Sequence, residues 1–328
     1  MEFIICFDMR APAFGAPRQA LFDAALDMCE WADQLGFDTV GLGEHHGVDD
    51  GYLPSPIAMA SAIGARTQHI TVRPNVLQAP LYDPVKLAED LAVAQYLCQG
   101  RLEVVIGAGY RPYEFQMFGK RREDRKDLYV NAFTFLRKAW TGQPFEYQGR
   151  SITITPTPEP LPKLLLGGSH PAVARRAAHI ADGYYPPAGE NWGVYRTTCL
   201  ELGKPDPGEY FKTLGPIYTH VSEQPEQDWS VIAPHIAHVV DSYTEWTVEA
   251  YGKASGPFAA GVDIKALRES GNYQVDKPQQ IIENILALGK NRSFILNPLI
   301  GGLDPAIAWR GLRLFEQEVW PAVKALQD

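Results

Sequence analysis

Basic residues, cysteine pairs and long apolar runs are all scarce in this sequence of 328 residues. It has 30 Lys and Arg against 39 Asp and Glu, which gives a formal charge of −9. Because nucleic-acid binding needs clustered basic side chains that neutralise phosphates, this balance argues against a nucleic-acid partner. We expect a small-molecule ligand instead.

The cysteines and the apolar runs also exclude several classes of protein. No two of the four cysteines have the C-x-x-C spacing of zinc sites, and their wide separation does not suggest a disulfide framework, so we expect reduced thiols. No apolar run approaches the roughly 20 residues that span a bilayer, and the first residues lack a basic region with a cleavage site. We therefore expect a cytoplasmic protein with no membrane association.

The sequence is rich in short apolar runs that alternate with amphipathic segments. Eight runs are predicted strands, at residues 3–7, 39–42, 70–77, 102–106, 163–166, 183–185, 214–221 and 293–296. Helices are predicted after residues 56 and 84 and at 19–35, 125–140, 171–181, 229–251, 278–288 and 306–326. This alternation favours parallel strands with right-handed crossovers. It predicts an α/β fold, a single (β/α)8 TIM barrel with insertions over residues 1–328.

Three features interrupt that alternation. Pro74 lies inside a predicted strand and cannot donate a ladder hydrogen bond, so it predicts a bulge or distortion there. Residues 144–155 predict a hairpin insertion that turns at Gln148-Gly149. Residues 222–277 are too long for an ordinary connection, and such variable segments are usually lids or substrate loops, with a dimer contact as the structural alternative.

The stretch Glu44-His45-His46 follows the predicted strand at 39–42 directly. Loops at the carboxyl ends of parallel strands surround ligands in α/β proteins, so all three are predicted catalytic residues. An imidazole that titrates near neutral pH suits acid–base chemistry. The structural alternative is one histidine in the core and one at the surface. We expect no metal, because adjacent histidines rarely direct both rings at one ion.

The stretch Gly168-Ser169-His170 is a candidate phosphate site, because it ends a predicted strand and precedes a helix with proline in its first turn. Free backbone N–H groups at such a point suit an anion. Ser169 or His170 would be the cap and the side-chain donor. The rival loop at residues 301–305 is where barrels usually bind phosphate, but Asp304 is expected to cap its own helix and to repel an anion.

Together with other motifs these stretches form one series. The motifs are Glu44-His-His46, Pro80-Leu-Tyr-Asp-Pro-Val85, Gly107-x-Gly109 and residues 178–183. The series resembles the luciferase-like flavin monooxygenases from the first strand to about residue 183, and again in the last helix. The resemblance implies a (β/α)8 barrel that binds reduced FMN, or in some branches the deazaflavin F420. Residues 191–272 match nothing in this series, and we expect the substrate contacts there.

The resemblance also implies roles for single residues. His45 takes the place of the histidine at the reactive edge of the flavin. Asn75 and Val76 take the place of a cis peptide beneath the flavin ring. Gly109 and Tyr110 fall where the backbone meets the polar rim of the ring, with a plain glycine turn as the alternative.

The chain departs from this resemblance at one position. Ala108 stands where the luciferase pattern has an arginine that binds the phosphate. Arg111 is the candidate substitute. If Arg111 does not take that role, the tail of the cofactor differs, and F420 stays an alternative.

The function that the resemblance implies is oxygenation of a small organic substrate with reduced FMN and oxygen. We expect a separate flavin reductase to supply the FMN, and a homodimer. His45 would act as general base or hydrogen-bond partner of the reacting groups, His46 would assist, and Glu44 would fix a tautomer or cap the loop. The alternatives are F420-dependent hydride transfer and a flavin-binding protein without catalysis.

Overall fold

The computed structural model describes residues 1–187, 189–210, 216–254, 263–290 and 292–327. Contacts divide the chain into two compact units. Unit 1 contains Met1–Gly41, His45–Pro54 and the described residues from 216 onward. Unit 2 contains Leu42–Glu44 and Ser55–Tyr210. The expectation of a single domain therefore stays a prediction.

The sheet strands of unit 1 are β1 (Glu2–Phe7), β2 (Thr39–Leu42) and β11 (Ser293–Leu296), in the order β11-β1-β2. β1 and β11 pair in parallel, with Glu2 opposite Ser293. Each strand is a short apolar run buried along most of its length, as expected where both faces are covered. All three strands were predicted from the sequence.

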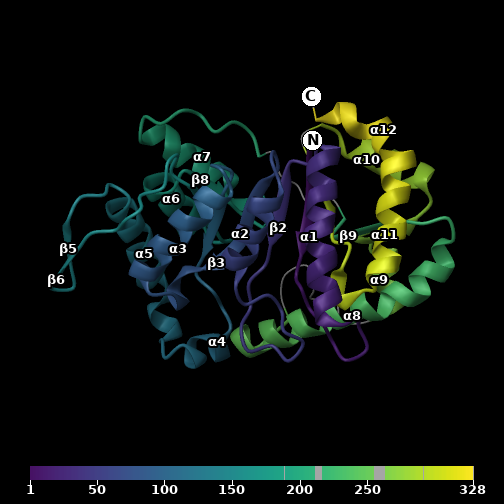
Figure 1. The fold of residues 1–328 in the computed structure, drawn as a ribbon, viewed down its shortest axis with the longest axis horizontal. Coiled ribbons are helices and arrows are strands. Elements are labelled where there is room, and N and C mark those ends of the chain that lie inside the picture. Colours follow the sequence, from purple (N-terminus) through teal and green to yellow (C-terminus); the bar gives the residue numbers. More distant parts are fainter. Residues whose placement is uncertain (188, 211–215, 255–262, 291, 328) are drawn as a thin grey trace. The chain divides into compact units, whose positions relative to one another are not determined.

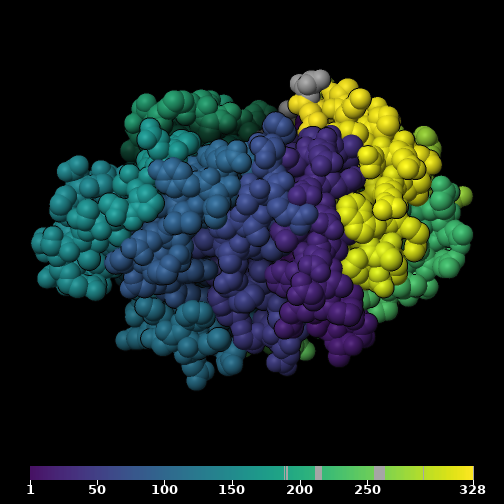
Figure 2. All heavy atoms as spheres, in the orientation of Figure 1, coloured from purple at the N-terminus to yellow at the C-terminus, as the bar shows by residue number. Residues whose placement is uncertain are grey.

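Helices α1 (Arg18–Leu35), α10 (Pro278–Leu288) and α11 (Pro305–Leu314) belong to the same unit. α1 ends at Gly36, which adopts the left-handed conformation with φ 97°. Trp31 of α1 and Trp309 of α11 lie edge to face with centroids 6.2 Å apart, and the purple and yellow surfaces of these helices adjoin in Figure 2.

The last helix is interrupted, whereas one continuous helix over 306–326 was expected. After α11 the chain forms a π-helical segment (Phe315–Val319) and then α12 (Trp320–Val323). Pro321 explains the change, because it has no N–H and its ring would clash with the carbonyl four residues earlier. The wider π-turn before it avoids that clash.

The pairing predicted for the seventh strand, at residues 214–221, is wrong. Its described part is β9 (Tyr218–Val221), which pairs in parallel with β10 (Tyr273–Asp276) as a separate two-stranded sheet; residues 214 and 215 lie outside the described residues. β10 and the preceding α9 (Ile264–Glu269) were missed, because a four-residue strand beside Gly271 reads as a loop. A closed eight-stranded barrel is not seen in the described part of the chain.

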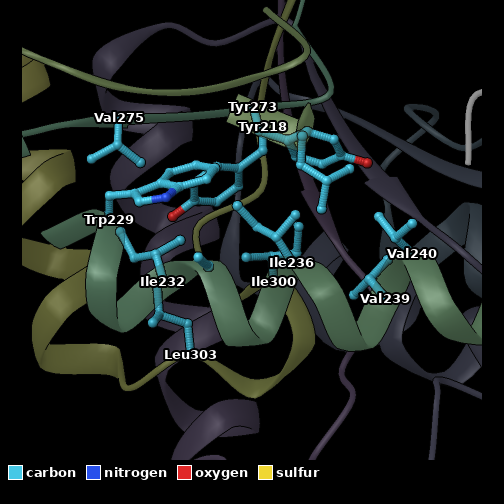
Figure 3. Packing of buried hydrophobic residues seen from close by; sticks show 12 residues of the cluster. Tyr218, Trp229, Ile232, Ile236, Val239, Val240, Tyr273, Val275, Ile300 and Leu303 are labelled. Atoms are coloured by element: carbon cyan, nitrogen blue, oxygen red, sulfur yellow. The ribbon is translucent and has the colours of Figure 1, made fainter. Parts of the chain in front are cut away.

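The long segment after β9 is largely helical. α8 (Pro225–Tyr251) begins with a proline in its first turn, four residues earlier than predicted. Buried side chains recur along it at three- and four-residue spacing and pack on β9 and β10, as Figure 3 shows. They are Trp229, Ile232, Ile236, Val239 and Val240, which lie with Tyr218, Tyr273 and Val275. A core of this size holds α8 in place.

Unit 2 contains four parallel strands in the order β3-β4-β7-β8: β3 (Thr71–Gln78), β4 (Glu103–Gly107), β7 (Lys163–Gly167) and β8 (Gly183–Tyr185). All four were predicted. The register between β3 and β4 shifts between Asn75 and Leu77. The distortion predicted from Pro74 is confirmed.

Helices surround these strands, and a hairpin extends from them. The helices are α2 (Pro56–Arg66), α3 (Pro84–Leu97), α4 (Pro112–Met117), α5 (Arg125–Ala139), α6 (Pro171–Ile180) and α7 (Trp192–Glu201), of which α4 and α7 were not predicted. The hairpin consists of β5 (Phe145–Tyr147) and β6 (Arg150–Ile152) and reaches outward beyond α5 (Figure 1). Gln148 and Gly149 both have positive φ, as its two-residue turn requires.

Two further expectations concern cysteines and membrane helices. The four cysteines Cys6, Cys29, Cys98 and Cys199 are all free. No described helix is long and apolar enough to cross a bilayer.

Candidate active site

The candidate residues of unit 2 gather at the carboxyl ends of three neighbouring strands. Gln78, the last residue of β3, lies opposite Gly107, the last residue of β4, and Ile106 lies opposite Leu166 of β7. Because the strands are parallel and in this register, the loops that follow them leave the sheet at one edge.

Glu44 is held at this edge by three hydrogen bonds. Its carboxylate oxygens accept from the backbone N–H of Gln78 (2.7 Å) and from the hydroxyl of Tyr82 (2.8 Å), and its carbonyl accepts from the side-chain amide of Gln78 (3.1 Å). Burial, followed by the neighbouring carboxylate, raises the pKa of Tyr82, so its hydroxyl stays a donor. Two roles were predicted for Glu44, fixing a histidine tautomer and capping the loop. These bonds favour capping.

Gly109 lies against the same glutamine. Its φ is +68°, and a Cβ at this position would lie 2.5 Å from Oε1 of Gln78 and 3.3 Å from the ring of Phe115. The positive φ favours glycine here, and any added side chain would also have to displace the end of the Gln78 side chain. Oε1 of Gln78 is buried and has no hydrogen-bond partner among the described residues, which leaves one acceptor open for a ligand.

The peptide bond between Asn75 and Val76 is cis, as the resemblance implied. The side chain of Val76 is enclosed by two glycines of the neighbouring strands. A Cβ at Gly107 would meet it at 2.7 Å, and one at Gly167 would meet it at 3.0 Å. The missing side chains on β4 and β7 therefore make the space that Val76 fills.

The loop Gly168-Ser169-His170 joins β7 to the first turn of α6. Ring Nδ1 of His170 accepts from the backbone N–H of Ala172 at 3.1 Å, so His170, not Ser169, is the side-chain cap. An imidazole whose Nδ1 accepts carries its proton on Nε2 when it is neutral. The exposed ring therefore has one N–H to donate at the start of the ten-residue helix α6. The expected free N–H groups of α6 are not found, because those of Ala172, Val173 and Ala174 all donate to His170.

Carbonyls in this loop are tied back to the fold. The hydroxyl of Tyr184 donates to the carbonyl of Gly168 (2.6 Å), and the amide of Asn191 donates to that of Ser169 (2.5 Å). These two hydrogen bonds fix the backbone of the loop. The exposed side chains of Ser169 and His170 stay available.

Arg111 and Tyr110 follow Gly109 in the loop after β4. Arg111 is buried and pairs with Glu114 at 3.5 Å between Nη1 and Oε1, while Tyr110 is half-buried. Part of the charge on Arg111 is thus balanced by a carboxylate. Its use as a phosphate ligand stays a prediction.

The rival loop after β11 is occupied by protein groups of unit 1. The ring of His235 hydrogen-bonds the carbonyl of Gly301 (2.8 Å), and the N–H of Gly301 reaches Asp8 (3.4 Å). Asp304 accepts from the N–H of Ala306 (2.7 Å), so it caps α11 as predicted. Two carboxylates beside this loop disfavour a phosphate.

In unit 1 His45 is buried among aromatic rings. Its centroid lies 4.9 Å from Tyr52, 5.7 Å from Tyr243 and 4.6 Å from Trp246, and the two tyrosine hydroxyls are 3.0 Å apart. The residue is 7% exposed. His46 is also buried, which excludes the structural alternative of one core and one surface histidine.

A buried ion pair lies against the same rings. Nε of Arg10 donates to Oδ2 of Asp50 at 2.6 Å, and the ring of His238 reaches that oxygen at 2.7 Å. The guanidinium of Arg10 lies over Tyr52 (5.4 Å) and Trp246 (5.2 Å). Burial tends to raise the pKa of Asp50, but its bond to His238 and the charge of Arg10 outweigh this and leave the pKa below its usual value.

Sequence reasoning missed several of these residues. Arg10 stands three residues after β1, so the rule that placed Glu44 at a strand end would also have selected it. Tyr243 and Trp246 lie on α8, some 200 residues from His45, and no spacing in the sequence connects them. Gln78 was missed because a polar last residue of a strand has no distinctive signature.

Among the described residues no group of three His, Cys, Asp or Glu is arranged to hold a metal ion.

The comparison with known proteins points to one family. Residues 1–291 match the family described as luciferase-like monooxygenase. The chain is 29% identical over 188 residues to an F420-dependent glucose-6-phosphate dehydrogenase of Microbacterium testaceum, which covers 53% of this chain and 55% of that protein. It is 26% identical over 116 residues to the oxygenase component of a flavin-dependent trigonelline monooxygenase of Acinetobacter baylyi, covering 35% of this chain and 32% of that protein.

A solved structure agrees over nearly the full length. The oxygenating constituent of 3,6-diketocamphane monooxygenase from Pseudomonas putida, in complex with FMN, superimposes with a TM-score of 0.74 at 18% identity and covers 98% of both chains. This likeness shows the fold. By contrast, the chain spans only 32–55% of the length of the two curated relatives named above. The match over residues 1–291 places this chain in the luciferase-like monooxygenase family of oxidoreductases.

Proposed function

We propose that this protein is a flavin-dependent monooxygenase that uses reduced FMN and oxygen to oxygenate a small organic substrate. The observation that carries the proposal is the placement of His45, a titratable group buried in aromatic surroundings at the end of β2. Such surroundings exclude water, which oxygenation with a reduced flavin requires. When bound, the flavin would supply the electrons and the oxygen activation.

The residues of unit 2 fit a flavin. Nε2 of His170 and the hydroxyl of Ser169, at the positive end of α6, suit the phosphate. The unpartnered Oε1 of Gln78 suits a ring N–H, and Gly109 leaves backbone exposed beside it. Asn75, Val76 and Tyr110 keep the roles that the resemblance implies, beneath the ring and at its rim.

His45 is the proposed acid–base group. It would accept or donate one proton at the reacting atoms, and the packed rings of Tyr52, Tyr243 and Trp246 hold its orientation. His46 would assist, and Glu44 would hold the loop through Gln78 and Tyr82.

Hydride transfer with F420 is the second candidate. The relative from Microbacterium testaceum is named as an F420-dependent dehydrogenase and is similar over 53% of this chain. The absence of an arginine at Ala108 also leaves room for a cofactor with a different tail. In that reaction His45 would take the proton of an alcohol and no oxygen would be activated.

The remaining proposals concern assembly and location. The TM-score of 0.74 to the diketocamphane oxygenase supports a closed (β/α)8 barrel in the assembled enzyme. The relative from Acinetobacter baylyi is named as an oxygenase component, which supports a separate flavin reductase as the source of reduced FMN. A homodimer in the cytoplasm completes the proposal.

The experiment that tests it is a titration of the purified protein with reduced FMN and with reduced F420 under anaerobic conditions. We expect tight binding of FMN and weak binding of F420. Oxygen is then admitted with a panel of candidate substrates, and oxygenated product is measured by mass spectrometry with ¹⁸O₂. Binding of F420 alone, or a product without ¹⁸O, would replace the monooxygenase by the dehydrogenase.

A further inference from the structure

The guanidinium of Arg10 is completely buried, yet only one of its three nitrogens is bound by the protein. Its exposure is 0%, and Nε donates to Asp50 at 2.6 Å. Nη1 and Nη2 have no hydrogen-bond partner among the described residues. A buried charged donor without a partner is costly, so a fold keeps one only where something else satisfies it.

Arg101 shows how this fold treats a structural arginine. Its Nη1 and Nη2 donate to the carbonyls of Gly64, Thr67 and Ile70 and to the hydroxyl of Thr67, and only its Nε has no partner among the described residues. Arg10 has the opposite arrangement. Its inner nitrogen is fixed, and its two outer nitrogens are left open.

The surroundings of Arg10 do not supply the missing acceptor. Asp50 accepts from Arg10 and His238 with Oδ2 and from the N–H of Tyr52 with Oδ1, so both oxygens are used. Asp8 accepts the backbone N–H of Arg10, not its side chain. Burial raises the pKa of Asp8, although the nearby Arg10 opposes the shift.

The open nitrogens lie beside the proposed catalytic group. Arg10 and His45 contact the same two rings. The guanidinium lies 5.4 Å from the ring of Tyr52 and 5.2 Å from that of Trp246, and the imidazole lies 4.9 Å and 4.6 Å from the same two rings. Arg10 and His45 are therefore part of one aromatic cluster.

We propose that Arg10 is a substrate-binding residue that takes the carboxylate of a small organic acid through Nη1 and Nη2. A planar carboxylate matches two parallel N–H groups of a guanidinium, and Asp50 holds the guanidinium in position from its other side. This inference rests on the proposed function in one respect, because it names the class of substrate that His45 would serve.

The test compares benzoate with its neutral amide, benzamide, in calorimetric titrations of the full chain before and after addition of FMN. We expect one site per chain that binds benzoate about 10- to 100-fold more tightly than benzamide, the effect of a charge-assisted hydrogen bond. Arg10→Gln should remove the preference, and Arg10→Lys should restore part of it. Arg310→Gln removes a guanidinium that is bound to Asp228 on the surface, and it should bind benzoate as the unaltered protein does.

Several results would overturn the inference. Two of them need no variant: equal affinity for benzoate and benzamide, and no binding of benzoate. The third is a loss of benzoate binding in folded Arg310→Gln as large as that in folded Arg10→Gln. Loss of FMN binding in Arg10→Gln, or complete displacement of benzoate by FMN, would assign the guanidinium to the flavin instead. If neither FMN nor F420 binds while benzoate does, the proposed function fails and the carboxylate site stands.

Discussion

Gln78 binds Glu44 at two points, through its backbone N–H to the carboxylate and through its side-chain amide to the carbonyl. The same glutamine lies against Gly109, where any Cβ would come within 2.5 Å of its Oε1. One polar residue at the end of β3 thus couples the loop after β2 to the loop after β4. The first two predictions concern this link.

Gly109→Ala should destabilise the protein by more than its backbone conformation alone requires. A non-glycine residue in the left-handed region costs about 1–2 kcal/mol, and here the methyl group must also displace Gln78. Gly119→Ala is the matched control, because Gly119 has a φ of +63° with nothing within 4 Å of the added Cβ. Urea unfolding measures both variants. An equal loss in the two would show that Gln78 yields without cost.

Tyr82→Phe should reduce stability by about 1 kcal/mol, because one carboxylate oxygen of the buried Glu44 loses its donor. Glu44→Ala should cost more, since it leaves the N–H of Gln78 and the hydroxyl of Tyr82 unpaired together. The double variant measures the coupling between them. If the two losses simply add, the hydrogen bond seen here contributes nothing to folding.

The phosphate loop predicts a difference between FMN and riboflavin. Ser169→Ala combined with His170→Ala should weaken FMN binding about 10-fold or more, because the phosphate loses two side-chain donors, the hydroxyl of Ser169 and Nε2 of His170. Riboflavin has no phosphate, so its affinity should change little. Asp304→Ala at the rival helix α11 is the control and should leave both affinities unchanged. A change of FMN affinity without a change of riboflavin affinity in the control would instead move the phosphate to residues 301–305.

His45→Ala should bind reduced FMN and yet lose turnover by about 10²–10⁴-fold, the usual contribution of a positioned acid–base group. Anaerobic titration gives the affinity, and steady-state product formation gives the rate. A variant that turns over normally would remove His45 from the mechanism, and His46→Ala would be examined next.

His220 predicts a loss of stability in mild acid. It lies buried in β9 against Gly311, and burial lowers its pKa to about 4, although Asp228 opposes the shift. The unfolded chain takes up this proton near pH 6.5 and the folded chain only near pH 4, so between these values the unfolded state binds more protons. His220 therefore makes its full contribution to the free energy of unfolding above pH 6.5. This free energy should fall by at most ~1.4 kcal/mol per pH unit as the pH drops toward 4.

His220→Gln provides the control for the other groups that titrate in this range. The difference in unfolding free energy between the two proteins should change with pH between 6.5 and 4 and be constant above it. A difference that is the same at every pH would mean that His220 titrates normally in the folded state.

The sequence alone determined the alternation of strands and helices, because each apolar run and each amphipathic period is a local pattern. It located all seven of the strands β1, β2, β3, β4, β7, β8 and β11, and it determined that Asp304 caps α11. A local pattern also sufficed for the turn at Gln148-Gly149, where both residues need positive φ.

Only the tertiary structure decided what lies around those residues. Nothing near β9 in the sequence identifies β10 as its partner, since pairing over 50 residues depends on how α8 folds between them. Trp246 likewise contacts both His45 and Arg10, although it lies some 200 residues from them in the sequence. Burial and hydrogen-bond satisfaction are properties of the assembled fold, so a sequence can place a side chain at a strand end without showing which of its atoms are left for a ligand.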